Sequence, residues 1–591
     1  MKKLSMYLAA ATLCLTPCLA LADALPFETL PDDVSGIELD MTHPIDNMIK
    51  GAWIEKVALG ESDTFDMYDY LPASSQVCEK SVLIILQSGV KADEFIVSSG
   101  WKEIADTNNV SLFLVPNDKA WAEDENAVEK VNAAFAAAKK RHYYDISWDL
   151  MNLIGYGDGA TTAMQFNMKS PDSFASVVLF GGDPVSQEYM DSVGAEPSFE
   201  DGITKNGVKC PVWIFADEAS EGVKAEIEYW KKANNNDSAA YSNEYADEVY
   251  MPSFIYHGMQ MDDWNIAQTR LTVGKNVDGI GVELLQEIYD DFLWVYARHR
   301  GIGNQELRYY LSPEDYGMTL YSAEVNGLTR YWYVYVPDCV KNSSQPVPLV
   351  VSMAGRGGSN TTFPSLTDWP LIANERGFIC AFPIAGYGRQ MKNGVGNIPM
   401  WNSSVDDVAF IDYMVKDVKK NYNIDNGRVY ANGQSMGSMM SMTLSVCLPD
   451  VFTATGSTCF ALPEKALSNE HYNDQIDCAS WLIYGEKDTT IGSYKMSESE
   501  SVQKCIDYYI DRYDLCSVDE AQTYRSGPFS HYVFTNKDGV PMFRYSVVEN
   551  KGHANLPSES YLLYDEFFAK YYRDENGELH YMESSDVLDI H

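Results

Sequence analysis

The chain alternates short apolar runs with amphipathic stretches, and it does so twice along its length. The apolar runs are 82–86, 112–115, 177–180 and 212–215 in the first half and 331–336, 349–353, 379–382, 429–431 and 481–484 in the second. The stretch 406–419 has the spacing of a helix with one buried face, formed by Val408, Ile411, Met414, Val415 and Val418. Strands that alternate with helices in this way predict an α/β fold with mainly parallel sheets.

The two halves also carry similar motifs in the same order. The matching segments are 101–105 with 369–373, 155–159 with 433–437, 171–174 with 449–452, and 289–292 with 564–567. The offset stays at about 270 residues, which is roughly the length of one domain and too long for a solenoid repeat. We therefore expect a duplication that produced two tandem domains of the same fold.

The length of 591 residues also favours two hydrophobic cores over one. We expect a signal peptide at 1–22, an N-terminal domain at 23–305 and a C-terminal domain at 306–591. The signal peptide is indicated by Lys2 and Lys3, the apolar stretch 7–21 and a small-residue cleavage pattern that ends at Ala22. These features predict a secreted protein without a membrane anchor.

The formal charge of −41 at pH 7 argues against nucleic acid and anionic membrane surfaces as partners, because both would repel such a protein. The charge does not identify a substrate, and solubility alone explains it equally well. The oligomeric state is left open by the sequence.

Cysteine usage fits an exported chain. Of the 11 cysteines, Cys14 and Cys18 fall in the predicted signal peptide, which leaves nine. An odd number leaves at least one thiol unpaired in a monomer. Cys505 and Cys516 are the pair that would close a short local disulfide loop.

A candidate nucleophile lies in the C-terminal half, in the sequence Gly-Gln-Ser-Met-Gly at 433–437. This fits G-x-S-x-G, a strained turn between a strand and a helix that exposes a serine above a parallel sheet. The matching segment 155–159 reads Gly-Tyr-Gly-Asp-Gly, so Gly157 replaces the serine. Ser435 therefore predicts a catalytic site in the C-terminal half, and Gly157 predicts that the matching site in the N-terminal half lacks a nucleophile.

A serine hydroxyl becomes a good nucleophile only when an imidazole removes its proton and a carboxylate orients that imidazole. Asp488 follows the apolar run 481–484 through a short loop, in which Glu486 is the nearest competitor. His553 follows the strand-like stretch 545–548. The chain order serine, acid, histidine is also the order found in hydrolases that carry such a serine turn. We predict Ser435 as nucleophile, Asp488 as acid and His553 as base.

The oxyanion that forms during attack needs backbone N–H donors. The sequence predicts one donor at Met436, directly after the nucleophile, and the other at Arg356 in the glycine-rich loop 354–359. The alternative interpretation of that loop is a plain glycine turn.

The segments 405–411, 422–425 and 428–431 lead into the 433–437 motif. Together they resemble the secreted polyhydroxybutyrate depolymerase and feruloyl or acetylxylan esterase group of the α/β-hydrolase superfamily. The resemblance covers about 315–575, and only the coarse frame of the first half.

This resemblance implies two tandem α/β-hydrolase-like domains, and carboxylic ester hydrolysis by Ser435, Asp488 and His553 without a cofactor or metal. It also implies that Trp401, followed by Asn402, lines the substrate site. The group usually has histidine before the glycine of the oxyanion loop, whereas this chain has Ala354.

In the N-terminal half, alignment of the tryptophans Trp213 and Trp481 places Ala219 opposite Asp488, and the segment expected to match His553, 277–279, has no histidine. We therefore expect a degenerate, non-catalytic domain. Its role is either to bury a face of the C-terminal domain or, as a sharper hypothesis, to hold a polymeric substrate.

The resulting interpretation is a secreted serine esterase that acts on polysaccharide-linked acyl esters, feruloyl or acetyl, or on hydroxyalkanoate polyester. A serine peptidase of the same fold is the nearest alternative, because a triad does not distinguish esters from amides. A non-catalytic binding protein is the alternative from another class, and the intact order of serine, acid and histidine argues against it.

Overall fold

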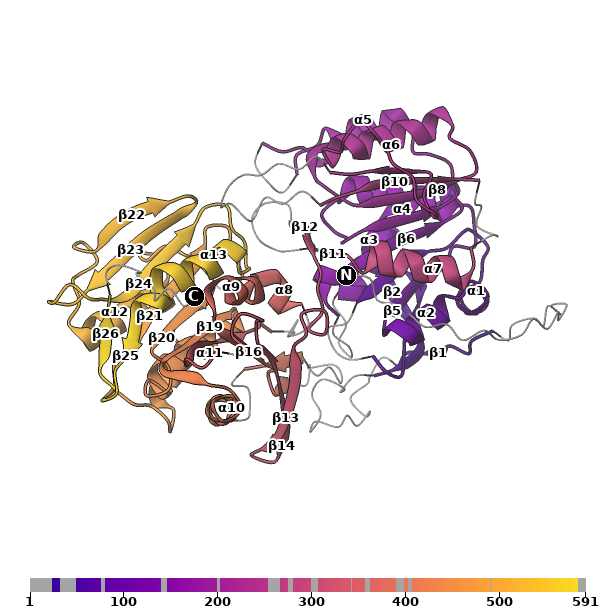
Figure 1. Ribbon diagram of the computed structural model, residues 1–591. Helices are drawn as coiled ribbons and strands as arrows, with labels where there is room; N and C mark the ends of the chain where they lie inside the picture. The colour runs from indigo at the N-terminus through magenta and orange to yellow at the C-terminus, as the bar shows by residue number, and fades with distance from the viewer. Residues whose placement is uncertain are drawn as a thin grey trace.

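The computed structural model describes residues 24–31, 49–75, 80–139, 146–198, 202–252, 266–274, 280–298, 307–341, 343–356, 362–389, 398–401, 406–490 and 492–582. The predicted signal peptide 1–22 and the predicted boundary between 305 and 306 lie outside these residues. The chain forms two lobes, each built around its own ten-stranded sheet (Figure 1).

The N-terminal sheet has a parallel centre and antiparallel pairing near both edges. Its strands, in spatial order, are β1 (Glu28–Thr29), β2 (Gly51–Leu59), β3 (Asp63–Leu71), β5 (Ser111–Val115), β4 (Ser81–Ile85), β6 (Met151–Tyr156), β7 (Val177–Phe180), β8 (Val212–Ala216), β10 (Thr269–Val273) and β9 (Glu248–Tyr250). The strands from β5 to β10 run parallel to one another, whereas β2, β3 and β9 pair antiparallel.

Helices cover both faces of this sheet, which explains why its central strands are apolar runs without alternation. Along β4, Val82 and Ile84 point into one hydrophobic core, and Leu83 and Ile85 point into the other. The first core is closed by α1 (Ala92–Ser98), α2 (Trp101–Asn108) and α7 (Val282–Ile288). The second is closed by α3 (Ala127–Lys139), α4 (Asp158–Lys169), α5 (Gln187–Gly194) and α6 (Glu221–Ala233).

The C-terminal sheet repeats the same arrangement. Its strands, in spatial order, are β13 (Thr319–Val325), β14 (Leu328–Tyr335), β16 (Ile379–Pro383), β15 (Val347–Met353), β19 (Ile424–Gln434), β20 (Ala454–Thr458), β21 (Ala479–Gly485), β24 (Pro541–Val548), β23 (Phe529–Thr535) and β22 (Gln522–Ser526). The helices are α8 (Phe363–Thr367), α9 (Trp369–Arg376), α10 (Asp407–Asn421), α11 (Met436–Cys447), α12 (Glu500–Tyr513) and α13 (Pro557–Leu562). The strands from β16 to β24 are parallel, so the predicted α/β fold with two mainly parallel, helix-covered sheets is confirmed.

Details outside the sheets support the duplication. Each domain has a π-helical segment at the matching place, Tyr289–Leu293 and Leu563–Phe567. An arginine follows each segment and binds matching carbonyl oxygens: Arg298 donates to those of Pro171 and Phe174, and Arg573 to those of Pro449 and Phe452. Such agreement in long-range contacts is hard to explain by chance similarity of motifs.

Each domain also ends in a small hairpin. β11 (Tyr296–Arg298) pairs with β12 (Leu307–Tyr309), and β25 (Tyr571–Arg573) pairs with β26 (Leu579–Tyr581). A third hairpin joins β17 (Tyr387–Arg389) to β18 (Ile398–Met400). The chain leaves β12 through Tyr310, which packs with Leu150 and Leu366 in a small apolar cluster between the two lobes.

The eight cysteines within the described ranges are all free thiols. The predicted Cys505–Cys516 bridge is therefore wrong. Cys505 is buried in the core on α12, whereas Cys516 lies beyond the end of that helix, where its backbone N–H donates to the carbonyl oxygen of Thr535. Within the same ranges, no helix combines the length and apolar character needed to cross a membrane.

A buried histidine makes the stability of the C-terminal domain depend on pH. His531 on β23 is 1% exposed, and its ring nitrogens bond the hydroxyls of Ser526 and Ser546. Burial, assisted by the charge of Arg544, lowers the pKa of His531 from 6.5 to about 4. The unfolded chain therefore binds the proton more tightly, so this contribution to stability is complete above pH 6.5 and is lost as the pH falls toward 4.

The expected loss is at most about 3 kcal/mol of unfolding free energy between pH 7 and pH 4. Urea unfolding at several pH values measures it. His531→Gln is expected to flatten the dependence in this window, and Ser530→Ala on the same strand serves as the matched control. A His531→Gln protein with the wild-type pH slope would contradict the assignment.

Candidate functional site

Ser435 lies at the sharp turn between β19 and α11, at the carboxyl edge of the parallel strands. Its backbone has φ 55° and ψ −116°, a conformation that is rare and strained for a residue with a side chain. The N–H of Ser435 is held by the carbonyl oxygen of Thr458 at the end of β20. The predicted strand, turn and helix around Ser435 are present.

The three residues predicted for the triad meet at this edge. The Nε2 atom of His553 is 2.8 Å from the hydroxyl oxygen of Ser435, and its Nδ1 atom is 2.7 Å from a carboxylate oxygen of Asp488. A carboxylate only accepts hydrogen bonds, so the Nδ1 atom carries the hydrogen and the Nε2 atom of the neutral ring accepts from the serine. This is the arrangement in which the imidazole can take the serine proton.

Asp488 is held in the ionised form that this arrangement needs. Its side chain is fully buried, and burial alone would raise its pKa. The hydrogen bond from His553 and the one from the N–H of Thr490 outweigh burial and hold the pKa of Asp488 below its usual value. Glu486, the competing carboxylate, instead accepts the N–H of Asn550 and does not contact His553.

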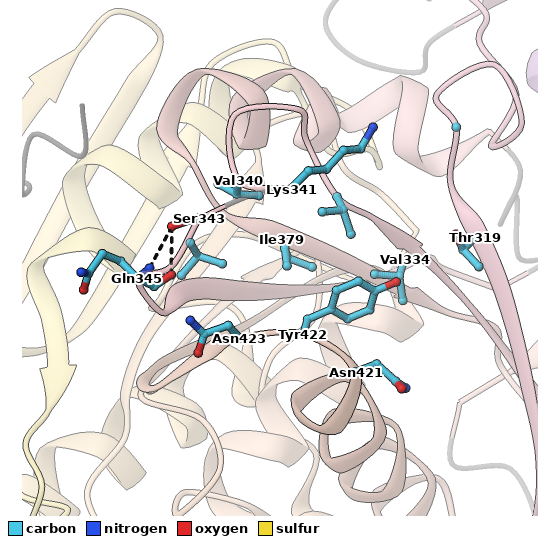
Figure 2. A pocket seen from close by; sticks show the side chains of 13 residues that line it. Thr319, Val334, Val340, Lys341, Ser343, Gln345, Ile379, Asn421, Tyr422 and Asn423 are labelled. Carbon is cyan, nitrogen blue, oxygen red and sulfur yellow. Dashed lines mark hydrogen bonds between the residues drawn. The ribbon is translucent and has the colours of Figure 1, made fainter.

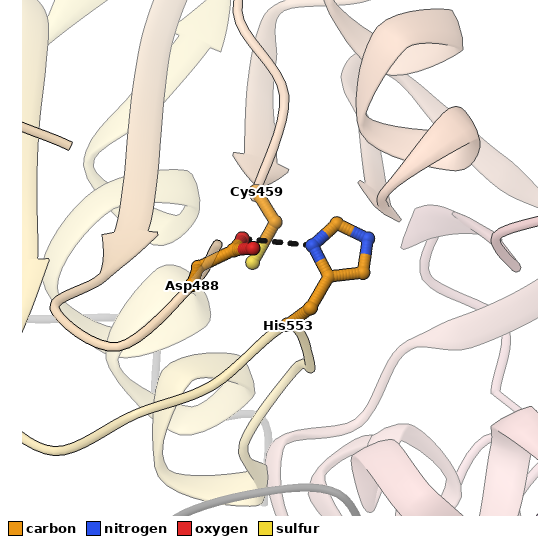
Figure 3. A group of neighbouring side chains, drawn as sticks. All are labelled: Cys459, Asp488 and His553. Carbon is orange, nitrogen blue, oxygen red and sulfur yellow. Dashed lines mark hydrogen bonds and ion pairs between the residues drawn. The ribbon is translucent and has the colours of Figure 1, made fainter. Parts of the chain in front are cut away.

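Cys459 is a neighbour of the triad that sequence reasoning missed. Figure 3 shows its thiol beside the Asp488 carboxylate, and the sulfur, a carboxylate oxygen and a ring nitrogen of His553 all lie within 4.8 Å of one another. The residue is fully buried at φ 71°, and burial raises the pKa of its thiol, so the sulfur keeps its proton and donates it to the carbonyl oxygen of Ala554 at 3.6 Å. The strand that Cys459 follows, β20, reads Ala-Thr-Gly-Ser-Thr, so no apolar run in the sequence marks its position.

The predicted oxyanion loop lies against the nucleophile. A methyl group added to Gly355 would lie 3.1 Å from the Cβ atom of Ser435 and 2.6 Å from the side-chain oxygen of Gln434. Met436 begins α11, and Arg356 is exposed at the end of the described loop. The roles of Met436 and Arg356 as backbone donors stay predictions.

Trp401, predicted to line the substrate site, is fully buried. Its indole N–H donates to the carbonyl oxygen of Ala354 at 2.8 Å. The side chain thus supports the loop that carries Gly355. Direct contact with a substrate stays a prediction.

The N-terminal domain retains the backbone of this site. Strand pairing places Ile85 beside Gly155 and Met353 beside Gly433, which makes Gly157 the equivalent of Ser435. Gly157 has φ 53° and ψ −133°, close to the values of Ser435. Trp121 donates its indole N–H to the carbonyl oxygen of Leu86, as Trp401 does to that of Ala354.

In this second site, the space that a side chain at position 157 would need is occupied by a neighbouring side chain. Gln87 is the equivalent of Gly355, and a methyl group on Gly157 would lie 2.7 Å from its side chain. In the C-terminal domain the nucleophile position carries a side chain, Ser435, and the loop position facing it is Gly355. In the N-terminal domain the arrangement is reversed, with Gly157 at the nucleophile position and Gln87 in the loop.

Asp158, the residue after Gly157, also occupies this second site. Its carboxylate accepts the N–H of Ser88 at 2.8 Å and the N–H of Trp121 at 3.0 Å. Ser88 is the equivalent of Arg356, so the amide predicted to bind an oxyanion in one domain binds an internal carboxylate in the other. This finding favours the structural role of the N-terminal domain over substrate binding at its old site.

Asp158→Ala is expected to lower the unfolding free energy of the N-terminal domain by about 1.5–3 kcal/mol, because two amides lose a charged acceptor. Urea unfolding, with exchange of the Ser88 and Trp121 amides followed by mass spectrometry, measures the loss. Asp183→Ala, at a neighbouring exposed carboxylate, is the control. Unchanged amide protection in Asp158→Ala would contradict the prediction.

The remaining triad positions of the N-terminal domain hold no matching residues where the structure describes them. Counting from the paired tryptophans, the position of Asp488 falls on Ser220, which corrects the predicted Ala219. The hydroxyl of Ser220 accepts the N–H of Val223 and caps α6. The segment 277–279, predicted to match the His553 loop, lies outside the described residues.

A separate pocket of about 370 Å³ lies at the other end of the C-terminal sheet (Figure 2). Val347 at the start of β15 and Ile379 at the start of β16 line it, together with Tyr422. Ser435 follows the carboxyl end of β19, which runs parallel to β15, whereas the pocket lies at the amino ends of β15 and β16. The pocket is therefore distinct from the triad.

Comparison with known proteins supports the resemblance to esterases. No protein-family profile matches the chain. It is 32% identical over 144 residues to a feruloyl esterase B of Talaromyces funiculosus, covering 24% of this chain and 40% of that protein. It is 22% identical over 238 residues to a poly(3-hydroxyalkanoate) depolymerase C of Paucimonas lemoignei, covering 35% of this chain and 54% of that protein.

Among solved structures, an acetyl xylan esterase from Aspergillus awamori aligns with a TM-score of 0.32 and 14% identity, covering 42% of this chain and 98% of that one. The chain thus spans about half or less of the two curated relatives. Their names are those of the group that the sequence motifs indicated, and the predicted resemblance is confirmed.

Proposed function

We propose that this protein is a serine esterase that hydrolyses carboxylic esters through the C-terminal domain. The observation that carries the proposal is the contact of His553 with both Asp488 and Ser435, at 2.7 and 2.8 Å. The relatives named as esterases and depolymerases support the same reaction class.

In this proposal, His553 removes the proton of Ser435 as the hydroxyl oxygen attacks the ester carbonyl. The backbone N–H groups of Met436 and Arg356 bind the resulting oxyanion. The protonated imidazole then gives its proton to the leaving alcohol, and an acyl-enzyme remains. A water molecule, activated by the same imidazole, releases the acid. No metal or organic cofactor enters any of these steps.

The substrates proposed are feruloyl or acetyl esters on a polysaccharide, or a hydroxyalkanoate polyester, acted on outside the cell after secretion. The names of the relatives support these classes, and the basic and apolar stretches within 1–22 support export. The N-terminal domain is proposed to be non-catalytic, because Gly157 has no nucleophile and Asp158 occupies the matching amide.

Hydrolysis of an ester panel tests the proposal. The panel contains p-nitrophenyl acetate and butyrate, methyl ferulate, acetylated xylan and hydroxybutyrate oligomers, with peptide p-nitroanilides measured in parallel. We expect ester turnover without peptide turnover, and the ranking by kcat/KM identifies the acyl group. Turnover of peptides alone would make the protein a peptidase. Silence on both panels, together with no labelling of Ser435 by a fluorophosphonate, would favour a binding protein.

A further inference from the structure

A buried ion pair lies directly behind the triad. Lys551 is two residues before His553, and its ammonium group contacts a carboxylate oxygen of Glu559 on α13. Both side chains are fully buried. Neither residue takes part in the chemistry described above.

The two residues link the segments that carry the triad. The carbonyl oxygen of Lys551 accepts the N–H of Lys487, the residue before Asp488. The other carboxylate oxygen of Glu559 accepts the hydroxyl of Thr458 at 3.1 Å. Thr458 in turn holds the N–H of Ser435 through its carbonyl oxygen. Two hydrogen bonds therefore connect the ion pair to the backbone of Ser435, one connects it to the residue before Asp488, and Lys551 is two residues from His553 along the chain.

The fit around Lys551 leaves little freedom. A methyl group added to Gly485 at the end of β21 would lie 2.4 Å from the carbonyl oxygen of Lys551. The His553 loop is thus pressed against the strand that leads to Asp488, while the Lys551 side chain ties it to α13. Such a loop has few ways to shift the imidazole relative to its two partners.

A contribution to folding stability does not by itself explain why charged residues occupy these two buried positions. Taking two charges out of water costs several kcal/mol for each ion, and apolar residues of similar volume often stabilise a protein as well or better. A buried pair can instead fix the position of the two segments that carry it, because separating the charges would leave each of them buried without a partner. An imidazole displaced by about 1 Å loses a large part of its catalytic effect.

We propose that the Lys551–Glu559 ion pair is a positioning element that fixes the His553 loop, and thereby the imidazole, between Asp488 and Ser435. The proposal rests on the proposed function, because it concerns the same triad. It makes Lys551 and Glu559 positioning residues, since neither touches the reacting atoms.

The test replaces the pair by apolar residues of similar size, Lys551→Met with Glu559→Leu. This double variant avoids leaving one charge buried and unpaired. The matched control is Lys504→Met with Glu464→Leu, at an ion pair whose side chains are 54% and 73% exposed in the same domain. For each protein we would measure thermal unfolding, kcat and KM for p-nitrophenyl acetate, and the rate at which a fluorophosphonate labels Ser435.

We expect the double variant to fold, with kcat and the labelling rate lowered about 10- to 100-fold and KM changed less than about 2-fold. The control pair is expected to leave all three values unchanged. Lys551→Arg, which keeps the ion pair, is expected to retain more of kcat than Lys551→Met. A folded double variant with wild-type kcat and labelling rate would overturn the proposal.

Folding and function can be separated in this design. If the double variant does not fold, Lys551→Met with Glu559→Gln, which keeps an acceptor for Thr458 and removes both charges, gives the same comparison. If neither variant folds, the pair is a requirement for folding, and the positioning role is overturned. If the wild type labels at Ser435 but hydrolyses no ester, the esterase function fails while the labelling rates still decide the role of the pair.

Discussion

Replacing Ser435 by alanine is expected to lower kcat for ester hydrolysis by about 10⁶-fold, the size of effect seen when a triad nucleophile is removed. Ser435 supplies the atom that forms the acyl-enzyme, and its hydroxyl lies 2.8 Å from the Nε2 atom of His553, which is to remove its proton. Any activity that remains would come from substrate binding and the oxyanion donors alone. Initial rates with the best ester of the panel, and the absence of fluorophosphonate labelling, provide the measurement.

Ser438→Ala is the matched control for this variant. Ser438 lies three residues further along α11 and donates its hydroxyl to the carbonyl oxygen of Phe460 at 2.8 Å, without contacting His553. Its loss should cost about 1 kcal/mol of stability and little activity. An active Ser435→Ala enzyme would place the chemistry elsewhere in the molecule and remove the basis of the proposed function.

The second large effect is expected from Asp488→Asn, which should lower kcat by about 10⁴-fold. The amide cannot replace the carboxylate that holds the hydrogen on the Nδ1 atom of His553, so the Nε2 atom is no longer kept free to accept the serine proton. The charge that stabilises the protonated ring is lost as well. The pKa of Asp488 is held below its usual value despite burial, so the wild-type carboxylate stays charged through the neutral range.

The kcat of Asp488→Asn and of Asp507→Asn, at an exposed position of α12, would be compared at pH 7 with thermal unfolding measured in parallel. A loss of kcat with little change in unfolding temperature is the expected result. If Asp488→Asn kept full activity and Glu486→Gln lost it, the acid of the triad would have to be reassigned.

Most central strands and the three triad residues could be predicted because both depend on local patterns, although the central strands β6 and β20 were not among the predicted runs. Continuous apolar runs mark strands buried on two faces, and Ser435, Asp488 and His553 each follow such a run at the edge where parallel strands end. The edge strands escaped prediction for the same reason. β22, for example, is almost wholly exposed and its sequence is mostly polar.

Contacts between distant segments could not be predicted from these patterns. Cys459 comes close to Asp488 only after β20 and β21 have been brought side by side. The hydrogen bonds that join Lys551 to Lys487 and Glu559 to Thr458 also connect segments far apart along the chain. The expectation for Trp401 came from family resemblance, which located the residue beside the site but did not show that its ring is buried beneath Ala354. The disulfide expected from spacing also failed, because separation along the chain does not fix the direction of two thiols.

The packing of Gln87 against Gly157 also determines what it would take to build a serine turn in the N-terminal domain. A return of serine at position 157 would collide with Gln87, whose side chain lies 2.7 Å from the place of the missing Cβ atom. The reverse change at position 87 alone would leave a hole and no nucleophile. A serine turn like that of Ser435 would therefore require two substitutions in the N-terminal domain, one at position 157 and one at position 87.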